Sequence, residues 1–300
     1  MKPAICCYTE ANVEVVENAD ISLRAELGYA ELFFDVKPRP SNDFFVDPPP
    51  SESTDRASHD FFAHSADSLV NRHRDRAFGQ HLSYVMEIFA RQYRTFIFSV
   101  SMSGSCARLL RWDRAGCIVS ESFDIREQPE LLCDFLWQFS QVTHDRRGHD
   151  PTVELASSRE ATIFLDAVKR HVQSQLEVNG QGLEAAVSEH YEQSHVVAMH
   201  VLDHKDVSTG HPIRRFIVSR PTASSLRAIG KGTKGFWAVD PSNHTVVFLK
   251  DTWRLPPFHV SEGDTIRLLH SKDVRNIPSV IYYGDVPDFI PRKKHKFTRQ

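Results

Sequence analysis

Residues 230–251 read GKGTKGFWAVDPSNHTVVFLKD, and this stretch decides how the C-terminal part of the chain folds. It opens with a G-x-G-x-x-G run at Gly230, Gly232 and Gly235, a pattern that occurs in dinucleotide-binding folds and also by chance. A dinucleotide-binding fold places a helix directly after the glycines. Here a β-rich stretch, an Asp-Pro-Ser-Asn turn and a second strand ending at Lys250 follow instead. The order predicts a glycine-rich hairpin with a lysine on the adjoining strand.

This order of parts is the one that protein kinases use to hold ATP. Glycine backbone approaches the nucleotide phosphates closely, and the strand lysine neutralises phosphate charge. A glutamate on the following helix holds the lysine, and Glu262 lies at the start of a predicted helix with an apolar face. The alternative is a glycine-rich hairpin with a solvated lysine. Each feature alone favours that alternative, whereas the ordered set of three favours the kinase interpretation.

The sequence resembles the fungal-type protein kinases over most of residues 80–290. The matching stretches are RTFIFSVSMSGSCARLLRWDRAGCIVSESFDI (94–125), PELLCDFLWQFS (129–140), GHDPTV (148–153), GKGTKGFWAV (230–239), VVFLKDTWR (246–254) and NIPSVIYYGDV (276–286). The resemblance implies ATP and Mg²⁺ as cofactors and a protein substrate that the sequence does not specify. It places Lys250 at the nucleotide lysine, Glu262 at its helix partner, and Gly230 and Gly232 in the glycine loop.

Two residues depart from the family pattern near the nucleotide. Phe248 stands where an alanine normally lies against the adenine, and Trp237 stands where a smaller valine is expected. Both are predicted to crowd a bound nucleotide.

The catalytic loops of a kinase are a larger departure. Neither H-R-D-x-x-x-x-N nor D-F-G, which supply the catalytic base and a metal ligand, occurs after Lys250. The one His-Arg-Asp, at residues 73–75, precedes the glycines and is predicted to be a charged loop or a helix start. We therefore expect a truncated kinase domain that transfers the γ-phosphate to Ser or Thr only when the missing lobe is present.

The N-terminal part carries a second pattern of polar residues. Asp20, then Asp35 and Lys37 at the end of a hydrophobic strand, then Gln80 and Tyr84 on a helix resemble the restriction-endonuclease-like PD-(D/E)xK arrangement. Two carboxylates on neighbouring strands would share Mg²⁺, and the lysine would help to activate water. Asp-x-Lys is common, however, and a solvated strand end is the simpler alternative.

The nearby HDRRGHD sequence contains His144, His149 and Asp150, and it is predicted to be a polar loop because no further ligand lies near it in the sequence.

The composition limits the function classes. A net charge of −3 argues against a dedicated nucleic-acid-binding protein. Five cysteines without a CxxC pair predict reduced thiols in the cytoplasm or nucleus, and no apolar run of membrane-spanning length occurs.

We predict an α+β protein in two parts. Residues 1–205 would form a mixed sheet with flanking helices, with 38–75 largely loop, and residues 206–300 a partial kinase N-lobe. Three functions stay open: a kinase-type nucleotide-binding lobe, a Mg²⁺-dependent nuclease at Asp20, Asp35 and Lys37, and a non-catalytic interaction module.

Overall fold

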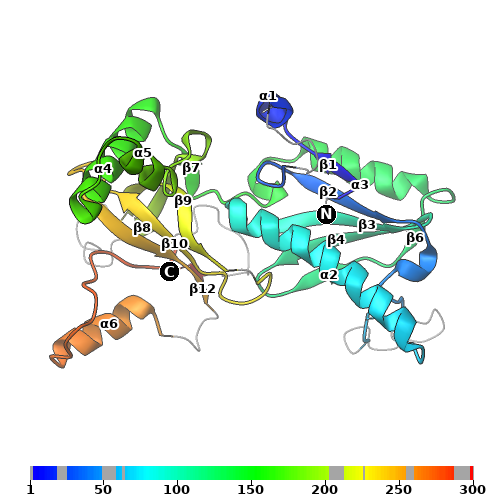
Figure 1. The fold of residues 1–300 in the computed structure, drawn as a ribbon. Helices are drawn as coiled ribbons and strands as arrows, with labels where there is room; N and C mark the ends of the chain where they lie inside the picture. Colours follow the sequence, from blue (N-terminus) through cyan, green and yellow to red (C-terminus); the bar gives the residue numbers. More distant parts are fainter. Residues whose placement is uncertain are drawn as a thin grey trace. The chain divides into compact units, whose positions relative to one another are not determined.

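The computed structural model describes residues 3–18, 26–48, 59–62, 65–202, 213–225, 227–254, 260–286 and 298–299. The chain forms two compact units. Unit 1 is Met1–Asp150 with Leu226–Ile229, and unit 2 is Pro151–Ser225 with Gly230–Gln300. Figure 1 shows the elements of each unit. Both units combine strands and helices, so the predicted α+β class is confirmed.

Unit 1 is built on a mixed sheet with strand order β1-β2-β3-β4-β5 and with β6 paired to β4. β2 and β3 run parallel, and the other neighbours are antiparallel. The strands are β1 (Ile5–Cys7), β2 (Leu32–Lys37), β3 (Phe96–Ser103), β4 (Cys106–Asp113), β5 (Cys117–Val119) and β6 (Phe123–Asp124). The parallel pair requires a crossover connection, and the long helix α2 (Ser68–Arg91) lies in it.

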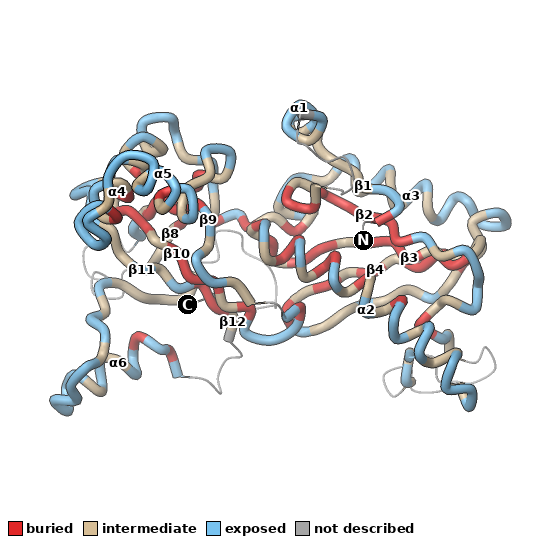
Figure 2. Tube along the Cα trace, in the orientation of Figure 1, coloured by how far each residue is buried: buried red, intermediate tan, exposed pale blue. Residues whose placement is uncertain are grey.

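Helices cover both faces of this sheet, which explains why β2 is a nearly continuous apolar run. Phe33 packs with α2 in one buried cluster, whereas Leu32 and Phe34 pack with α3 (Pro129–Gln141) in another. Figure 2 shows the buried strands of this layer. Because side chains alternate along a strand, Asp35 lies on the same face as Phe33 and therefore points towards α2. The remaining elements of unit 1 are α1 (Glu10–Asn18), η1 (Pro40–Asn42) and η2 (Asp145–Arg147).

Unit 2 is built on an antiparallel sheet with strand order β11-β10-β9-β8-β7. Its strands are β7 (Val153–Leu155), β8 (Val197–Leu202), β9 (Ile213–Ser224), β10 (Lys234–Val239) and β11 (Val246–Asp251). The other elements are α4 (Ser158–Leu176), α5 (Gly180–Ser188), η3 (Gln193–His195), α6 (Glu262–Ser271), and the paired β12 (Trp253–Arg254) and β13 (Thr298–Arg299). Helices α4 and α5 share a buried cluster with one face of the sheet.

Two predicted boundaries differ from the structure. The loop predicted to reach residue 75 ends earlier, because Asp67 caps α2 by accepting a hydrogen bond from the Leu69 backbone, so the His-Arg-Asp at 73–75 is helical. The boundary predicted near residue 205 lies between β8 and β9, which pair in one sheet.

Candidate functional site

The predicted lysine and glutamate of unit 2 are in contact. Lys250 Nζ donates a hydrogen bond to Glu262 Oε2, which joins β11 to the first residue of α6. Ser261 caps this helix by accepting a hydrogen bond from the Asp264 backbone at 2.9 Å, and this places Glu262 in the first turn. The two side chains are 41% and 52% exposed, so the pair is accessible to a ligand.

The glycine segment lies between β9 and β10, directly beside the lysine. Gly230 and Gly232 adopt positive φ values of 101° and 49°, a conformation that favours glycine. Gly235 pairs with Lys250 across the β10–β11 ladder. A Cβ on Gly235 would lie 2.5 Å from the Phe248 ring, so the close approach of that ring requires glycine here.

The Lys250 face of the sheet also carries Trp237 and Phe248, because residues opposite each other in an antiparallel ladder share a face. Trp237 packs against the α4–α5 cluster, where its ring is stacked on His190 with centroids 3.9 Å apart and touched edge-on by His171. Phe248 is 62% exposed. The two bulky residues therefore differ: Trp237 packs beneath helices, whereas Phe248 is largely exposed to solvent.

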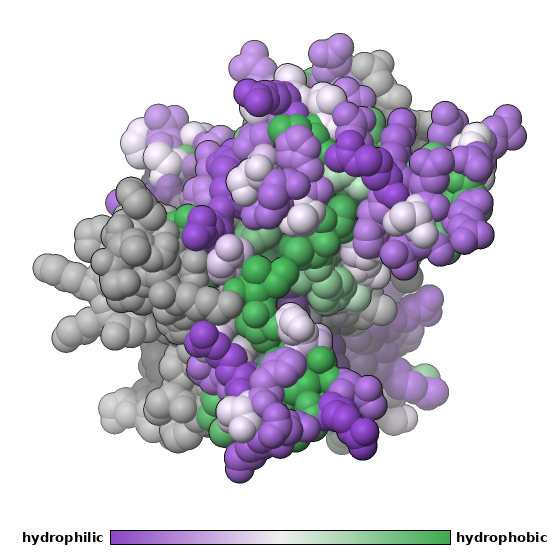
Figure 3. Space-filling view, turned by 90° about the vertical axis from the view of Figure 1, so that its left-hand side faces the viewer, coloured by the Kyte–Doolittle hydropathy of each residue, from purple (hydrophilic) through white to green (hydrophobic). Residues whose placement is uncertain are grey.

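Both units carry exposed apolar side chains. In the view of Figure 3 a band of apolar residues crosses a largely hydrophilic surface. The exposed apolar residues of unit 2 include Leu155, Phe248, Val260 and Leu268.

Four of the five predicted residues of the N-terminal pattern meet at one place in unit 1. Lys37 Nζ lies 3.0 Å from Asp35 Oδ1 and donates to Gln80 Oε1 at 2.7 Å. Gln80 Nε2 in turn donates to the Tyr84 hydroxyl at 2.6 Å. Asp20, the fifth residue, lies outside the described residues. The cluster forms because β2 ends beside the middle of α2, where Gln80 and Tyr84 lie one turn apart.

A histidine that the sequence pattern did not include completes this cluster. His81 Nδ1 lies 3.4 Å from Asp35 Oδ2, and His81 Nε2 is 2.8 Å from the Ser99 hydroxyl. Burial would raise the pKa of Asp35, but His81 and Lys37 outweigh it and lower that pKa. Burial lowers the pKa of the fully buried His81. The contact between Asp35 Oδ2 and His81 at 3.4 Å does not meet the geometry of a hydrogen bond, so this buried oxygen is left without one.

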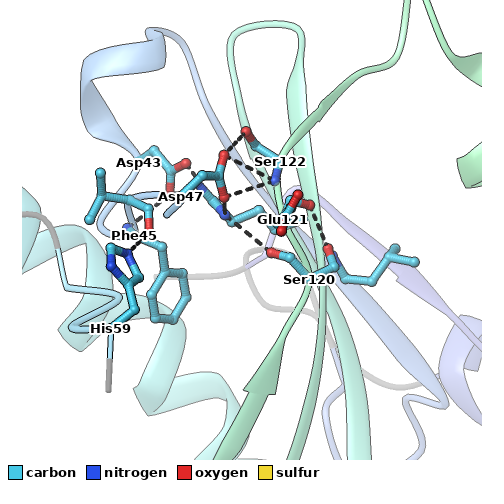
Figure 4. Close-up of polar contacts among 10 residues, drawn as sticks. Asp43, Phe45, Asp47, His59, Ser120, Glu121 and Ser122 are labelled. Atoms are coloured by element: carbon cyan, nitrogen blue, oxygen red, sulfur yellow. Dashed lines mark hydrogen bonds and ion pairs between the residues drawn. The ribbon is translucent and has the colours of Figure 1, made fainter. Parts of the chain in front are cut away.

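A buried arginine fixes the loop that follows β2. Arg108 of β4 donates to Asp43 at 2.8 Å and to Asp47 at 2.5 Å. Asp47 also accepts a hydrogen bond of 2.5 Å from the Ser122 hydroxyl, and Figure 4 shows its carboxylate directed at Ser122. These contacts tie residues 43–47 to β4 and to the connection between β5 and β6, and we assign them a structural role.

A third polar cluster joins the start of β2 to the HDRRGHD loop. His149 Nε2 lies 2.8 Å from Glu31 Oε1, and Arg94 Nη2 lies 3.3 Å from the same oxygen. Burial would raise the pKa of Glu31, but His149 and Arg94 outweigh it and lower that pKa to about 2. Burial also lowers the pKa of His149. His144 offers a ligand atom within 4.8 Å of ligand atoms on both Glu31 and His149.

Comparison with known protein families agrees with the kinase-like order of residues found in unit 2. A glycine segment, a strand lysine and a helix glutamate, in this order, are the nucleotide-binding parts of the protein-kinase class. The chain belongs to the fungal protein kinase family, whose model matches residues 60–298. The predicted resemblance is thus confirmed, and the family indicates a kinase-type transferase function with the ATP and metal use general to kinases. No curated protein and no solved structure matches the chain.

Within the described residues, no helix is both long enough and apolar enough to cross a membrane.

Sequence reasoning missed Glu31, Arg94 and His81. His81 lies three residues before Tyr84 on α2, so its presence at the site was within reach of the helical spacing. Glu31 and His149 are 118 residues apart, and nothing in the sequence links them.

Proposed function

We propose that unit 2 binds ATP through its phosphates, using Lys250 and the glycine segment at 230–235. The observation that carries the proposal is the contact between Lys250 Nζ and Glu262 Oε2. In kinases the strand lysine must be held by a helix glutamate to meet the nucleotide phosphates. Here the glutamate leaves the ammonium on an accessible face beside Gly235, where it would neutralise phosphate charge.

The fit differs between the phosphate end and the base end of the site. Positive φ values at Gly230 and Gly232 support a backbone that can approach phosphate closely. At the base end Trp237 is held by His190, and Phe248 lies over Gly235 on the lysine face. Phosphate contacts would therefore dominate binding, and the adenine would need Phe248 to turn away.

The finer activity, transfer of the γ-phosphate to Ser or Thr, needs more than these residues. It requires an aspartate base and a metal-binding aspartate in the H-R-D and D-F-G sequences, and neither sequence occurs in residues 251–300. For unit 2 we therefore propose nucleotide binding alone, and we assign no Mg²⁺ ligand there.

A thermal-shift titration tests this proposal. A ligand at about 100 times its dissociation constant stabilises the folded state by about 2.7 kcal/mol. We expect MgATP to raise the melting temperature beyond Mg²⁺ alone, and Lys250→Ala to abolish that difference. Lys272→Ala, an exposed lysine just after α6, is the matched control and should behave like the wild type. An equal MgATP shift in Lys250→Ala would overturn the proposal.

The second candidate is a Mg²⁺-dependent nuclease in unit 1. The convergence of Asp35, Lys37 and Gln80 supports it, as does the buried Asp35 oxygen without a hydrogen bond. Against it, Asp35 is 3% exposed and provides the one carboxylate of this cluster among the described residues. Mg²⁺ is usually held by one or two carboxylates together with waters and phosphate oxygens, so Asp20 would have to contribute.

Plasmid nicking separates this candidate from the first. The nuclease hypothesis predicts Mg²⁺-dependent nicking that Lys37→Met and Asp35→Asn abolish and that Lys250→Ala leaves unchanged. Nicking that persists in Lys37→Met would come from a contaminant and would exclude this site. A chain that neither nicks DNA nor binds MgATP would correspond to the interaction module.

A further inference from the structure

We propose that Glu31, His144 and His149 form a Zn²⁺-binding site in unit 1. Each of the three residues offers a ligand atom, and these atoms all lie within 4.8 Å of one another. Two imidazoles and a carboxylate are ordinary zinc ligands, and three protein ligands leave a fourth position for water. The site uses neither Lys250 nor Asp35, and it does not depend on the proposed nucleotide binding.

The loop that carries both histidines is held in one conformation. The His149 backbone donates to the His144 carbonyl at 3.0 Å, which closes the loop around η2. Gly148 has a φ of 97°, and a Cβ there would lie 2.0 Å from the Phe96 carbonyl oxygen. The Thr95 backbone donates to the Gly148 carbonyl at 2.8 Å. These contacts bring His149 against the start of β2 without any contribution from a metal.

The distances suit the replacement of a shared proton by a metal ion. His149 Nε2 lies 2.8 Å from one Glu31 oxygen and 3.0 Å from the other. Two ligands of a tetrahedral Zn²⁺ with bonds of about 2.0–2.1 Å lie about 3.3 Å apart, so this pair would open only slightly. His144 is exposed and can turn to close its wider separation.

Arg94 is the residue that orients the carboxylate. Its Nη2 lies 3.3 Å from Glu31 Oε1, while its other nitrogens donate to Gln92 Oε1 at 2.8 Å and to the Arg147 carbonyl at 3.0 Å. A guanidinium anchored in this way holds Oε1 of the carboxylate, and His149 Nε2 lies within 3.0 Å of both carboxylate oxygens. Outer partners of this kind commonly orient metal ligands. The positive charge of Arg94 also lowers the affinity of the site for a metal cation, compared with a glutamate that has no arginine beside it.

Cobalt titration of the chelator-treated full chain tests the proposal. Co²⁺ replaces Zn²⁺ and reports tetrahedral nitrogen and oxygen ligation by its visible absorption. We expect one bound Co²⁺, displaced by Zn²⁺. His144→Ala and His149→Ala should each weaken binding by about tenfold or more, at least the loss caused by removing an outer partner. His144 is exposed, so its replacement should leave the circular dichroism spectrum unchanged.

The matched control is His73→Ala, an exposed histidine on α2 in the same unit. It should bind Co²⁺ as the wild type does. Binding that His144→Ala and His149→Ala leave intact would assign the metal to other histidines and overturn the proposal. Absence of Co²⁺ binding by the wild type would overturn it equally.

Discussion

The chain contains two lysine–carboxylate pairs of the same chemistry in opposite surroundings. In unit 1, the side chains of Lys37 and Asp35 are 12% and 4% exposed, and Gln80 and His81 lie close around them. In unit 2, Lys250 and Glu262 are 41% and 52% exposed. Both pairs were predicted from the sequence as functional, yet the surroundings assign them different tasks.

Burial decides which task a pair can perform. An exposed ion pair contributes only about 0–1 kcal/mol to folding, so its lysine can exchange the glutamate for a phosphate at small cost. A buried pair has already lost its hydration, and removal of one partner leaves an uncompensated charge. The Lys250 pair is therefore suited to ligand binding, whereas the Asp35 pair contributes first to the stability of unit 1.

The largest expected effect is on the buried pair. Asp35→Ala leaves Lys37 and His81 without their carboxylate, and it should lower the free energy of unfolding by about 3–5 kcal/mol. Urea denaturation followed by circular dichroism measures this. Asp134→Ala, an exposed aspartate on α3, should change it by less than about 0.5 kcal/mol. Equal effects of the two variants would refute a structural role for Asp35.

Acid should weaken unit 1 through Glu31. Its folded-state pKa is lowered from 4.5 to about 2, so its stabilisation is present above pH 4.5 and is lost as the pH falls towards 2. The shift corresponds to about 3 kcal/mol. The lowered pKa of His149 acts in the same direction, because only the unfolded chain takes up that proton readily.

The control for this pH dependence is Glu31→Gln. Urea titrations between pH 7 and pH 2 should show a smaller loss of stability in this variant than in the wild type. Parallel curves for the two proteins would contradict the assigned pKa.

A smaller effect is expected where Phe248 covers the lysine face. Phe248→Ala removes an exposed ring that lies against Gly235, and it should tighten MgATP binding about tenfold, or about 1.4 kcal/mol. Competition with a fluorescent ATP analogue measures the affinity. Leu268→Ala, another exposed apolar residue of unit 2, should have no effect. Weaker binding in Phe248→Ala would show that the ring contacts the nucleotide instead of blocking it.

The smallest effect should be on the stability of the exposed pair. Lys250→Met and Glu262→Gln should each change the free energy of unfolding by less than about 1 kcal/mol. Urea denaturation measures the free energy of unfolding of both variants, for comparison with that of Asp35→Ala. A loss of about 3 kcal/mol in either would mean that this pair, too, is structural.

The sequence predicts local features well. Ser103-Gly104 and the Asp113–Gly116 turn mark the ends of β3 and β4 because glycine and aspartate favour turns, and the structure has strands on either side. The contact between Lys250 and Glu262 follows from the order of parts in the family. Gln80 and Tyr84 were found together because helical spacing is visible in the sequence.

Long-range contacts could not be predicted in the same way. A domain boundary was expected near residue 205. In the structure β8 and β9, which lie on either side of this position, pair in one sheet. Glu31 meets His149 only because the loop after α3 returns to the start of β3, where the Thr95 backbone donates to the Gly148 carbonyl. Trp237 was expected to lie beside a nucleotide. Its ring instead stacks on His190, and this contact depends on the packing of α5, which the sequence does not reveal.

Calorimetric titration of the full chain with MgATP tests directly whether Lys250 binds the nucleotide phosphates. We expect saturable binding to the wild type that is lost in Lys250→Met, weakened in Glu262→Gln and unchanged in Lys37→Met. Binding that survives Lys250→Met, or no binding to the wild type, would contradict the assignment of the exposed pair to nucleotide phosphates.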